Sequence, residues 1–390
     1  MGRKLLWASL VLAPITLLLR FVFHAGDTTL FVAAAASLIP LAWLIGEATE
    51  HAGEHTGPGI GGFLNASFGN APELIIALFA VNAGLPDVVR GSLVGSVVSN
   101  ILLVLGVALI FGGQGGHGRP LDRFSLLLQL GLVLVATALF LVPSVPSWTG
   151  DPERHTLTVL TIPVAIVLLG LYGFVTRRSL RRHKRLHEES GHEAQEGGWT
   201  LTVSLVALGA ATVVTALISE TLVHSLHAFA EAAEGGWTLP VSLVALGAAT
   251  VVTALISETL VHSLDSFAET AGISEFFIAA VIVAIVGNAA EHGGAIVIAS
   301  RGKLRLATEI AVSSSAQVAL LVTPAVALLS WLVRPALPLS FRPVELAAMG
   351  GAAALVALTV SDGRGRRWEG FFLVAVYAGV AAGFWVAGDR

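Results

Sequence analysis

The stretches Gly69-Asn70-Ala71-Pro72-Glu73 and Gly287-Asn288-Ala289-Ala290-Glu291 decide the fold, because they are two copies of one pattern, G-N-A-x-E, in strongly apolar sequence. In each copy the asparagine and the glutamate are three positions apart, so they share a helix face. The glycines Gly69 and Gly287 allow close backbone approach, and Pro72 frees a carbonyl in the preceding turn. A carboxylate at the centre of a membrane helix costs at least about 2.5 kcal/mol, so we expect both glutamates to be functional.

The apolar segment after each copy carries a second pair of oxygen donors. Ser96 and Asn100 lie four positions apart in the first half, as do Ser313 and Gln317 in the second. The distance from the motif glutamate to the second member of the pair is 27 positions in the first half and 26 in the second. We therefore predict two halves that place matching oxygen ligands at matching depths.

The composition is that of a membrane protein. Of 390 residues, 55% are hydrophobic and 12% are charged, whereas soluble domains carry about 25% charged residues. A membrane span needs about 20 mostly apolar residues, and many windows meet that requirement. The net charge of −4 gives no sign of a nucleic-acid partner, and the absence of cysteine excludes disulfides and thiolate metal sites. We predict an all-α integral membrane protein whose partner is the lipid bilayer.

The apolar blocks give ten spans, separated in the middle by a charged linker and two further apolar segments. The ten lie near 5–23, 29–56, 60–84, 91–112, 123–143, 155–176, 273–299, 306–331, 343–361 and 370–387, and the two further segments are 200–226 and 238–264. Cytoplasmic loops attract Lys and Arg. The basic cluster within 177–185 follows the sixth span, so six crossings place it on the same side as Arg3 and Lys4. We therefore predict that the N-terminus and this cluster are both cytoplasmic.

Residues 196–233 and 234–271 are nearly identical and offset by 38 positions. If only one copy crosses the membrane, the basic loops around Arg301 and Arg364 are cytoplasmic, as the positive-inside rule prefers. We therefore predict eleven spans. The second copy is the better candidate for the true span, because it leads by a short linker into the span at 273.

The prediction is two inverted five-helix repeats, spans 2–6 and 7–11, after an N-terminal helix, with the extra duplicated segment between them. The ranges are a first transmembrane helix at 1–28, a first repeat at 29–176, a charged cytoplasmic linker at 177–199, a duplicated segment that need not span at 200–233, and a second repeat at 234–390. Ion sites in inverted repeats lie near the midplane at the repeat interface.

Two carboxylates that face each other there would raise one another's pKa, and either one divalent cation or two protons would neutralise the pair. Calcium prefers six to eight oxygen ligands in flexible geometry. The predicted ligand set for Ca²⁺ and H⁺ is Glu73, Glu291, Asn70, Asn288, Ser96, Asn100, Ser313 and Gln317. A second set is predicted to gate the pathway or to pass protons, namely Glu47, Glu50, Glu258 and His292.

The segments GEATEHAGEHTGPGIGGFLNASFGNAPELIIALFAVNAG, GSLVGSVVSNILLVLG and IVGNAAEHGGAIVIA resemble the cation/proton exchanger branch of the calcium/cation antiporter superfamily. The resemblance implies eleven spans, calcium/proton exchange by alternating access, and Glu73 and Glu291 as essential ligands. It implies no enzyme and no prosthetic group, and for this chain it suggests a bacterial inner membrane. The duplicated segment and the basic start of the linker depart from the family pattern.

Two other functions remain open at this point. The first is an antiporter of the same fold that exchanges Na⁺ or K⁺ for protons. The second is a membrane-embedded zinc metallopeptidase, because His51, Glu54 and His55 match H-x-x-E-H. No third zinc ligand is evident nearby, and that reading explains neither copy of G-N-A-x-E. Oligomeric state has no signal in the sequence.

Overall fold

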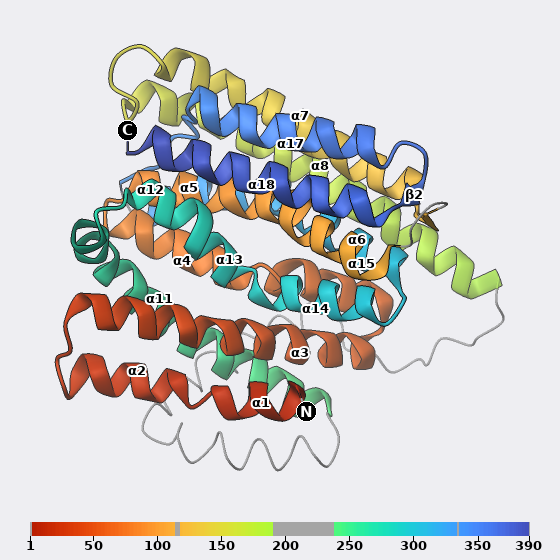
Figure 1. The fold of residues 1–390 in the computed structure, drawn as a ribbon, viewed down its shortest axis with the longest axis horizontal. Helices are drawn as coiled ribbons and strands as arrows, with labels where there is room; N and C mark the ends of the chain where they lie inside the picture. The colour runs from red at the N-terminus through yellow and green to blue at the C-terminus, as the bar shows by residue number, and fades with distance from the viewer. Residues whose placement is uncertain (1, 114–117, 190–237, 334, 390) are drawn as a thin grey trace. The chain divides into compact units, whose positions relative to one another are not determined.

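The computed structural model describes residues 2–113, 118–189, 238–333 and 335–389, and most of them are helical (Figure 1). The chain divides into two compact units. One comprises Met1–Ile75 and Gly173–Ser263, and the other comprises Ile76–Tyr172 and Leu264–Arg390. The predicted all-α membrane fold is confirmed. Each unit is described by itself.

The first unit is built on the long helix α3 (Asp27–Phe68), against which α1 (Gly2–Ser9) and α2 (Leu12–Phe21) pack. Trp7 and Trp43 meet edge to face with their ring centroids 5.3 Å apart, and the hydroxyls of Thr16 and Ser37 lie 2.9 Å apart. The unit also holds the start of α4 (Ala71–Asn82), the end of α8 (His155–Glu189) and most of α11 (Leu239–Ala271).

The second unit contains the helices that carry most of the predicted ligands. From the first half of the chain come α5 (Pro86–Val98), the π-helical turn η1 (Ser99–Val104), α6 (Leu105–Gly112), β1 (Arg119–Pro120), α7 (Arg123–Ser147) and the start of α8. From the second half come α12 (Glu275–Phe277), η3 (Ile278–Val283), α13 (Ala284–Gly287), α14 (Ala289–Ser300), α15 (Leu304–Gln317), η4 (Val318–Val322), α16 (Thr323–Val333), α17 (Pro343–Thr359), β2 (Arg364–Gly365) and α18 (Arg367–Ala387).

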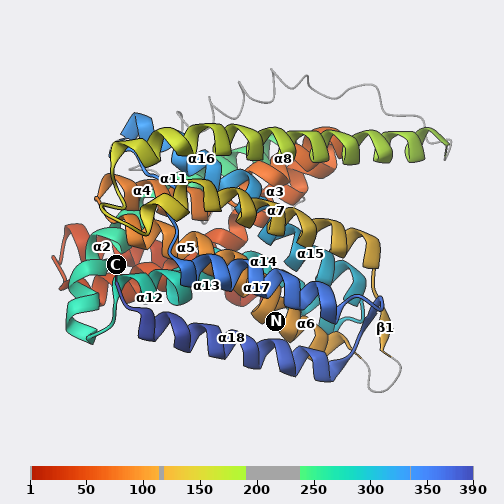
Figure 2. The ribbon, with the colours of Figure 1, turned by 90° about the horizontal axis from the view of Figure 1, so that it is seen from above.

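Helices from the two halves interleave within this second unit. Helix α18 runs along α6, α17 runs along α7, and α5 packs on η3 (Figure 2). The short antiparallel pair β1–β2 aligns Arg119 with Gly365 and so joins the two halves at one end. Gly95 lies so close to the neighbouring backbone that a Cβ atom there would be 2.0 Å from the carbonyl oxygen of Ala280. Small residues allow such close approach between membrane helices.

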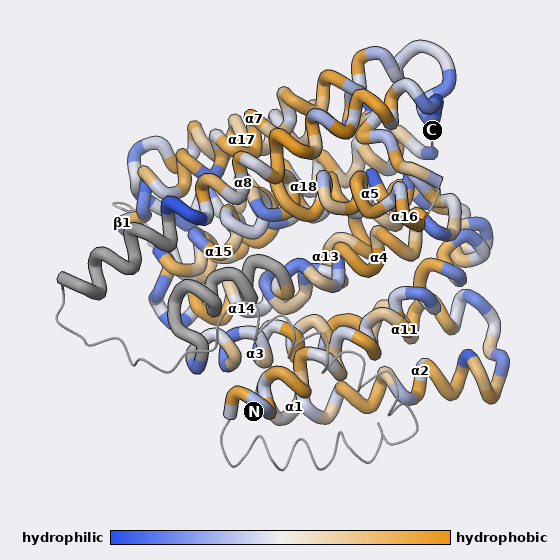
Figure 3. The backbone as a smooth tube through the Cα atoms, turned by 180° about the vertical axis from the view of Figure 1, so that it is seen from behind, coloured by the Kyte–Doolittle hydropathy of each residue, from blue (hydrophilic) through white to orange (hydrophobic). Residues whose placement is uncertain are grey.

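Seven helices in the described part of the chain are long and apolar enough to cross a membrane, and the bent pair Glu275–Gly287 with Ala289–Ser300 would make an eighth. Three shorter apolar helices, Leu5–Phe21, Ala71–Asn82 and Pro343–Thr359, fall where further spans are predicted. Hydrophobic residues cover most of the helix bodies, and hydrophilic stretches gather at the helix ends and turns (Figure 3). Each predicted span thus has a helical counterpart, while the total of eleven crossings stays a prediction.

One predicted boundary is wrong. The break predicted between 56 and 60 is absent, because α3 continues to Phe68 and the chain breaks instead at Gly69-Asn70. Gly and Asn are poor helix formers, and Pro72 is tolerated in a first turn, so this is the weaker point in the helix. The apolar span His155–Arg178 agrees with the predicted 155–176, and α8 continues beyond it as far as Glu189, since the Arg, Lys and Glu residues there favour helix.

The first copy of the duplicated segment, 196–233, lies outside the described residues, as do residues 190–199 of the linker. The second copy forms α11, whose 33 residues suffice to span a bilayer. The choice between the two copies stays a prediction.

We expect Gly95→Ala to destabilise the protein, because the added methyl group would push α5 away from η3. Overpacking of this kind costs about 1–3 kcal/mol. The matched control is Gly131→Ala on α7, where an added Cβ meets nothing within 4 Å. Thermal unfolding and size-exclusion profiles in detergent compare the two variants, and equal melting temperatures would contradict the expected close contact.

Candidate functional site

The second G-N-A-x-E motif breaks a helix. Helix α13 ends at Gly287, Asn288 leaves the helical conformation (φ −89°, ψ 13°), and α14 begins at Ala289. The two segments meet at 59°. Glu291 is consequently the third residue of a new helix, although the sequence suggests an uninterrupted span.

The first motif has the same construction. Helix α3 ends at Phe68 and α4 begins at Ala71, so Glu73 also occupies the third position of a new helix. Pro72 lies in that first turn, where a missing N–H leaves no hydrogen bond unmade. Asn70 and Glu73 are buried, with 1% and 7% of their surface exposed.

Both carboxylates therefore lie at the N-terminal end of a half-helix. Free N–H groups and the helix dipole give that end a partial positive charge, which favours negative groups. Discontinuous membrane helices with ends at the substrate site are typical of secondary transporters built from inverted repeats.

Asn288 is the hub of a buried hydrogen-bond network in the second unit. Asn288 occupies the N-cap position of α14, but its side chain accepts no hydrogen bond from the backbone N–H groups of that helix. Instead its Nδ2 donates to Ser96 Oγ and to the carbonyl of Ala284, both at 2.8 Å, and its Oδ1 accepts from Asn100 Nδ2 at 3.2 Å. The broken helix is thereby tied directly to α5 and η1.

The network continues from Asn100 to the motif glutamate. Asn100 Nδ2 also donates to Ser314 Oγ at 3.0 Å, and the Ser314 hydroxyl donates to the carboxylate of Glu291. His292 Nε2 lies 3.0 Å from Asn100 Oδ1, so the imidazole that carries its proton on Nε2 donates to that oxygen. Asn100 is fully buried, whereas Glu291 is partly exposed.

This cluster brings together five of the predicted residues within one unit: Ser96, Asn100, Asn288, Glu291 and His292. Two come from the first half of the chain and three from the second. The result is an oxygen-rich cluster in the apolar interior, made of one carboxylate, two amides and serine hydroxyls.

Ser314 belongs to the cluster, and sequence reasoning chose Ser313 instead. The Ser313 hydroxyl donates only within its own helix, to the carbonyl of Ile310 at 3.4 Å. A signal was available, because the 218 positions that separate Glu73 from Glu291 also separate Ser96 from Ser314. Gln317, the last residue of α15, is partly exposed and makes none of the cluster hydrogen bonds described above.

Two π-helical turns mark equivalent places in the two halves. Asn100 lies in η1, and η4 begins directly after Gln317. Such turns place an extra residue in a helical turn and are frequent at functional sites. Nothing in residue spacing alone indicated them.

Three of the four predicted gating residues, Glu47, Glu50 and Glu258, lie in the first unit, whereas His292 belongs to the cluster of the second unit. Glu47 Oε1 lies 3.5 Å from His51 Nε2 on the next turn of α3, and Glu50 is exposed. Glu258 on α11 is ion-paired with Arg20 of α2, a partner that the sequence did not indicate.

In the H-x-x-E-H pattern, His55 Nδ1 lies 2.7 Å from the carbonyl of His51. In the described part of the chain, which leaves out the Glu54 side chain, no group of three His, Asp or Glu side chains could hold a metal ion.

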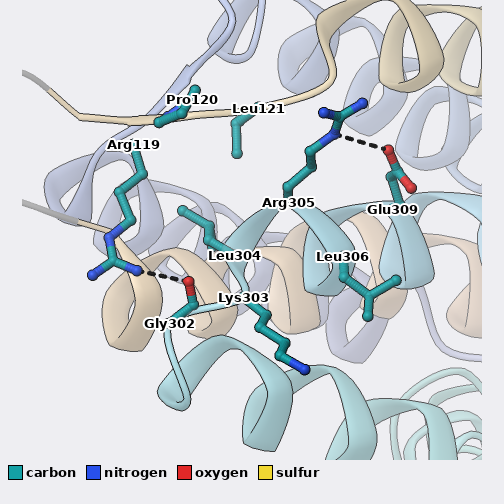
Figure 4. Close-up of a pocket in the computed structure, with 9 residues that line it drawn as sticks. All are labelled: Arg119, Pro120, Leu121, Gly302, Lys303, Leu304, Arg305, Leu306 and Glu309. Carbon is teal, nitrogen blue, oxygen red and sulfur yellow. Dashed lines mark hydrogen bonds and ion pairs between the residues drawn. The ribbon is translucent and has the colours of Figure 1, made fainter.

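One cavity of about 640 Å³ lies at the end of the second unit where β1 meets α15. Figure 4 shows Arg119 bonded to the carbonyl of Gly302 (2.8 Å) and Arg305 beside Glu309, with the Lys303 ammonium at the edge. This lining is mainly cationic and would repel Ca²⁺, so the cavity is unsuited to be a cation entrance.

The turn between α17 and α18 carries a titratable group outside the spans. Partial desolvation raises the pKa of Asp362, but the backbone N–H of Arg364 and the guanidinium of Arg366 outweigh it, so the pKa lies below its usual value. Asp362 thus remains ionised at neutral pH and stabilises the turn.

Broken helices, paired π turns and a buried oxygen cluster define an integral membrane protein of the ion-transporter class. The sequence pattern of the sodium/calcium exchanger protein family matches residues 27–180 and 241–386. The chain belongs to this family, which confirms the resemblance drawn from the motifs.

Relatives match along nearly the whole chain. The Ca(2+)/H(+) antiporter ChaA of Bacillus subtilis (strain 168) is 35% identical over 368 residues, which cover 93% of each chain. The Ca(2+)/H(+) antiporter of Aphanothece halophytica is 31% identical and covers 96% of this chain and 94% of the relative.

Solved structures agree in fold. Native YfkE superposes with a TM-score of 0.74 at 32% identity and covers 98% of this chain and 99% of its own. The H+/Ca2+ exchanger CAX, at 17% identity, has a TM-score of 0.65 over 99% of this chain and 92% of its own, and this likeness concerns the fold alone.

We expect Ser314→Ala to weaken cation binding and Ser313→Ala to leave it unchanged. The Ser314 hydroxyl bonds to Glu291 in this structure and can turn its oxygen toward a bound ion, so the variant loses one oxygen ligand. A polar contact to a charged group contributes about 1.5–3 kcal/mol, which is about tenfold or more in affinity. The measurement is the rise in melting temperature of the purified protein with added Ca²⁺ or Na⁺. A Ser313 variant that is impaired as much as the Ser314 variant would contradict this assignment.

Proposed function

We propose that the protein is a secondary active antiporter that exports cytoplasmic Ca²⁺ in exchange for H⁺ by alternating access. One observation carries the proposal: Ser96 and Asn100 from the first repeat and Asn288, Glu291 and Ser314 from the second form one buried oxygen cluster. The antiport named for the relatives supports the same function.

The chemistry of the cluster suits a hard cation. Calcium binds carboxylate, amide and hydroxyl oxygens in flexible geometry, with six to eight ligands. Such a site contains these three oxygen types, and the backbone carbonyls freed at each helix break could complete the shell. Ca²⁺ and H⁺ are substrates in this proposal, and no prosthetic group or enzymatic reaction takes part.

Exchange follows from the cost of an unneutralised site. We propose that Glu73 joins Glu291 around one ion, with Asn70 as the counterpart of Asn288. Two ionised carboxylates that share an apolar site repel each other, so the bare pair is disfavoured. One Ca²⁺ or two protons neutralise it, and the site therefore changes sides loaded with either but seldom empty.

The same proposal fixes the orientation. The N-terminus and the linker are cytoplasmic, and the two repeats cross the plasma membrane of a bacterium in opposite senses.

The family match stops at 180 and resumes at 241, inside the second copy of the duplication. This supports 234–271 as the crossing copy. An extra crossing by the first copy would place the basic loop around Arg301 outside.

A Na⁺/H⁺ or K⁺/H⁺ antiporter of the same fold is the competing function, and the ion that moves decides between them. In inverted membrane vesicles, an imposed proton gradient should drive Ca²⁺ uptake, with Na⁺ and K⁺ failing to compete at equal concentration. Uptake of Na⁺ without Ca²⁺ would refute the calcium assignment. The number of protons exchanged per ion gives a second test, because a monovalent ion neutralises one carboxylate and leaves the other to be protonated.

Within that assay, Glu73→Gln and Glu291→Gln should each reduce exchange to background, because either change removes one charge from the pair. The matched control is Glu269→Gln, which alters an exposed carboxylate of α11 outside both predicted sets and should retain at least about half of the activity. Size-exclusion profiles establish that the variants fold. Retained exchange in either motif variant would remove that glutamate from the ligand set.

The chain has no native cysteine, so one introduced thiol reports its own side of the membrane. We expect Ser300→Cys, exposed at the end of α14, to be labelled by an impermeant maleimide from the cytoplasmic side only. Inverted and right-side-out vesicles give the comparison. Labelling from outside would mean that both duplicated segments cross.

A further inference from the structure

An arginine in the last turn of α2 reaches a carboxylate of α11 within the first unit. Arg20 Nη2 lies 3.1 Å from Glu258 Oε1, and Arg20 Nη1 donates to Thr259 Oγ1 at 2.8 Å. Glu258 lies near the middle of the 33-residue apolar helix α11. Charged residues within apolar helices of this length are rare and mark ion pathways.

The equivalent carboxylate of the other repeat has a different partner. Both repeats contain I-x-E-x-x-x-H, with Glu47 and His51 on α3 and Glu258 and His262 on α11. Glu47 faces its own His51 at 3.5 Å. In the second repeat, His262 is exposed, and Glu258 forms its ion pair with Arg20. One repeat therefore pairs its carboxylate with a titratable base, and the other pairs it with a group that is always charged.

The Glu258 carboxylate is accessible to solvent, and the Arg20 guanidinium has a second interaction partner nearby. The Glu258 side chain is 44% exposed, whereas that of Arg20 is 18% exposed, so a second cation can approach the carboxylate. The Arg20 guanidinium carbon also lies 5.0 Å from the ring centre of Phe21. A cation–π contact of this kind can retain the arginine after it leaves the carboxylate.

We propose that Arg20 is a tethered cation that competes with the transported divalent cation for Glu258 and so sets the apparent affinity of the pathway. The inference rests on the proposed function. A carboxylate that holds a guanidinium through Oε1 cannot give a Ca²⁺ ion its full charge. The incoming ion must displace Arg20, and the arginine returns once the ion has passed.

The absence of native cysteine allows the charge at position 20 to be set by chemistry. Arg20→Cys is modified with a cationic or an anionic methanethiosulfonate, and adduct formation is checked by mass spectrometry. The readout is the KM for Ca²⁺ at fixed proton gradient. We expect unmodified Arg20→Cys to show a KM about fivefold lower, the upper range for loss of a part-exposed ion pair. The cationic adduct should restore the wild-type value, and the anionic adduct should not.

Two matched variants separate competition from structural support. In the Glu258→Gln background the KM should no longer depend on the charge of the adduct, because the contested carboxylate is gone. Thr259→Val removes the hydrogen bond from Arg20 Nη1 and the one that Thr259 donates to the carbonyl of Leu255, but it keeps both charges. It should therefore lower the KM by less than the loss of the Arg20 charge does, within about twofold of wild type. If Arg20→Cys does not fold, Arg20→Lys and Arg20→Gln give the same comparison of charged with neutral.

Equal KM values for the two adducts, or charge dependence that persists with Glu258→Gln, would overturn this inference while leaving antiport intact. A wild-type protein that exchanges no Ca²⁺ for protons would overturn the proposed function as well. The two failures are thus distinguishable.

Discussion

Polar groups in an apolar surrounding must find partners within the protein, and the break at Asn288 shows how this chain meets that requirement. Ending a helix in a membrane frees backbone groups that have no water to bind. Asn288 ends α13, and its amide then connects to Ser96, Ala284 and Asn100. One side chain thus ends a helix and ties the two repeats together within the second unit.

The close packing of the helices follows from that connection. Ser96 can lie 2.8 Å from Asn288 only if α5 approaches the segment before the break. The preceding residue, Gly95, makes this possible, because any side chain there would strike the backbone at Ala280. Gly91, one turn earlier, has the same relation to the carbonyl of Phe276, at 2.9 Å from the position of a Cβ. The small residues are therefore part of the site, although none binds an ion.

The sequence predicted what depends on residue type and repetition. Two motifs in apolar blocks were enough for an all-α membrane fold, for the family, and for Asn100, Asn288 and Glu291 as neighbours. It did not predict the helix breaks, because G-N-A-x-E fits a continuous helix as well as an interrupted one. The apolar blocks put a break between 56 and 60, whereas the helix breaks lie at Asn70 and Asn288, and only for Asn288 do hydrogen bonds to Ser96 and Asn100 account for the position.

Contacts outside the repeated motifs were beyond the sequence. The sequence favours Ser313, whereas Ser314 makes the hydrogen bonds of the cluster, and one residue turns a helical side chain by about 100°. The π-helical turns η1 and η4 also change which way side chains point, because the extra residue in each turn rotates every later side chain around the helix axis. The pairing of Arg20 with Glu258 joins residues 238 positions apart, and no local pattern encodes it.

The hydrogen bonds that hold the cluster are also those that a bound cation would have to replace. The Ser314 hydroxyl directs its proton at Glu291, and Asn100 directs its amide N–H groups at Ser314 and Asn288. Rotation about one side-chain bond turns the oxygen of the Ser314 hydroxyl or the Asn100 amide toward an ion. A hydrogen bond can thus be exchanged for a bond to a cation without movement of the backbone. Helix ends and close-packed glycines keep the cluster in place while its protons reorient. In the proposed exchange, this same cluster accepts protons and a metal ion in turn.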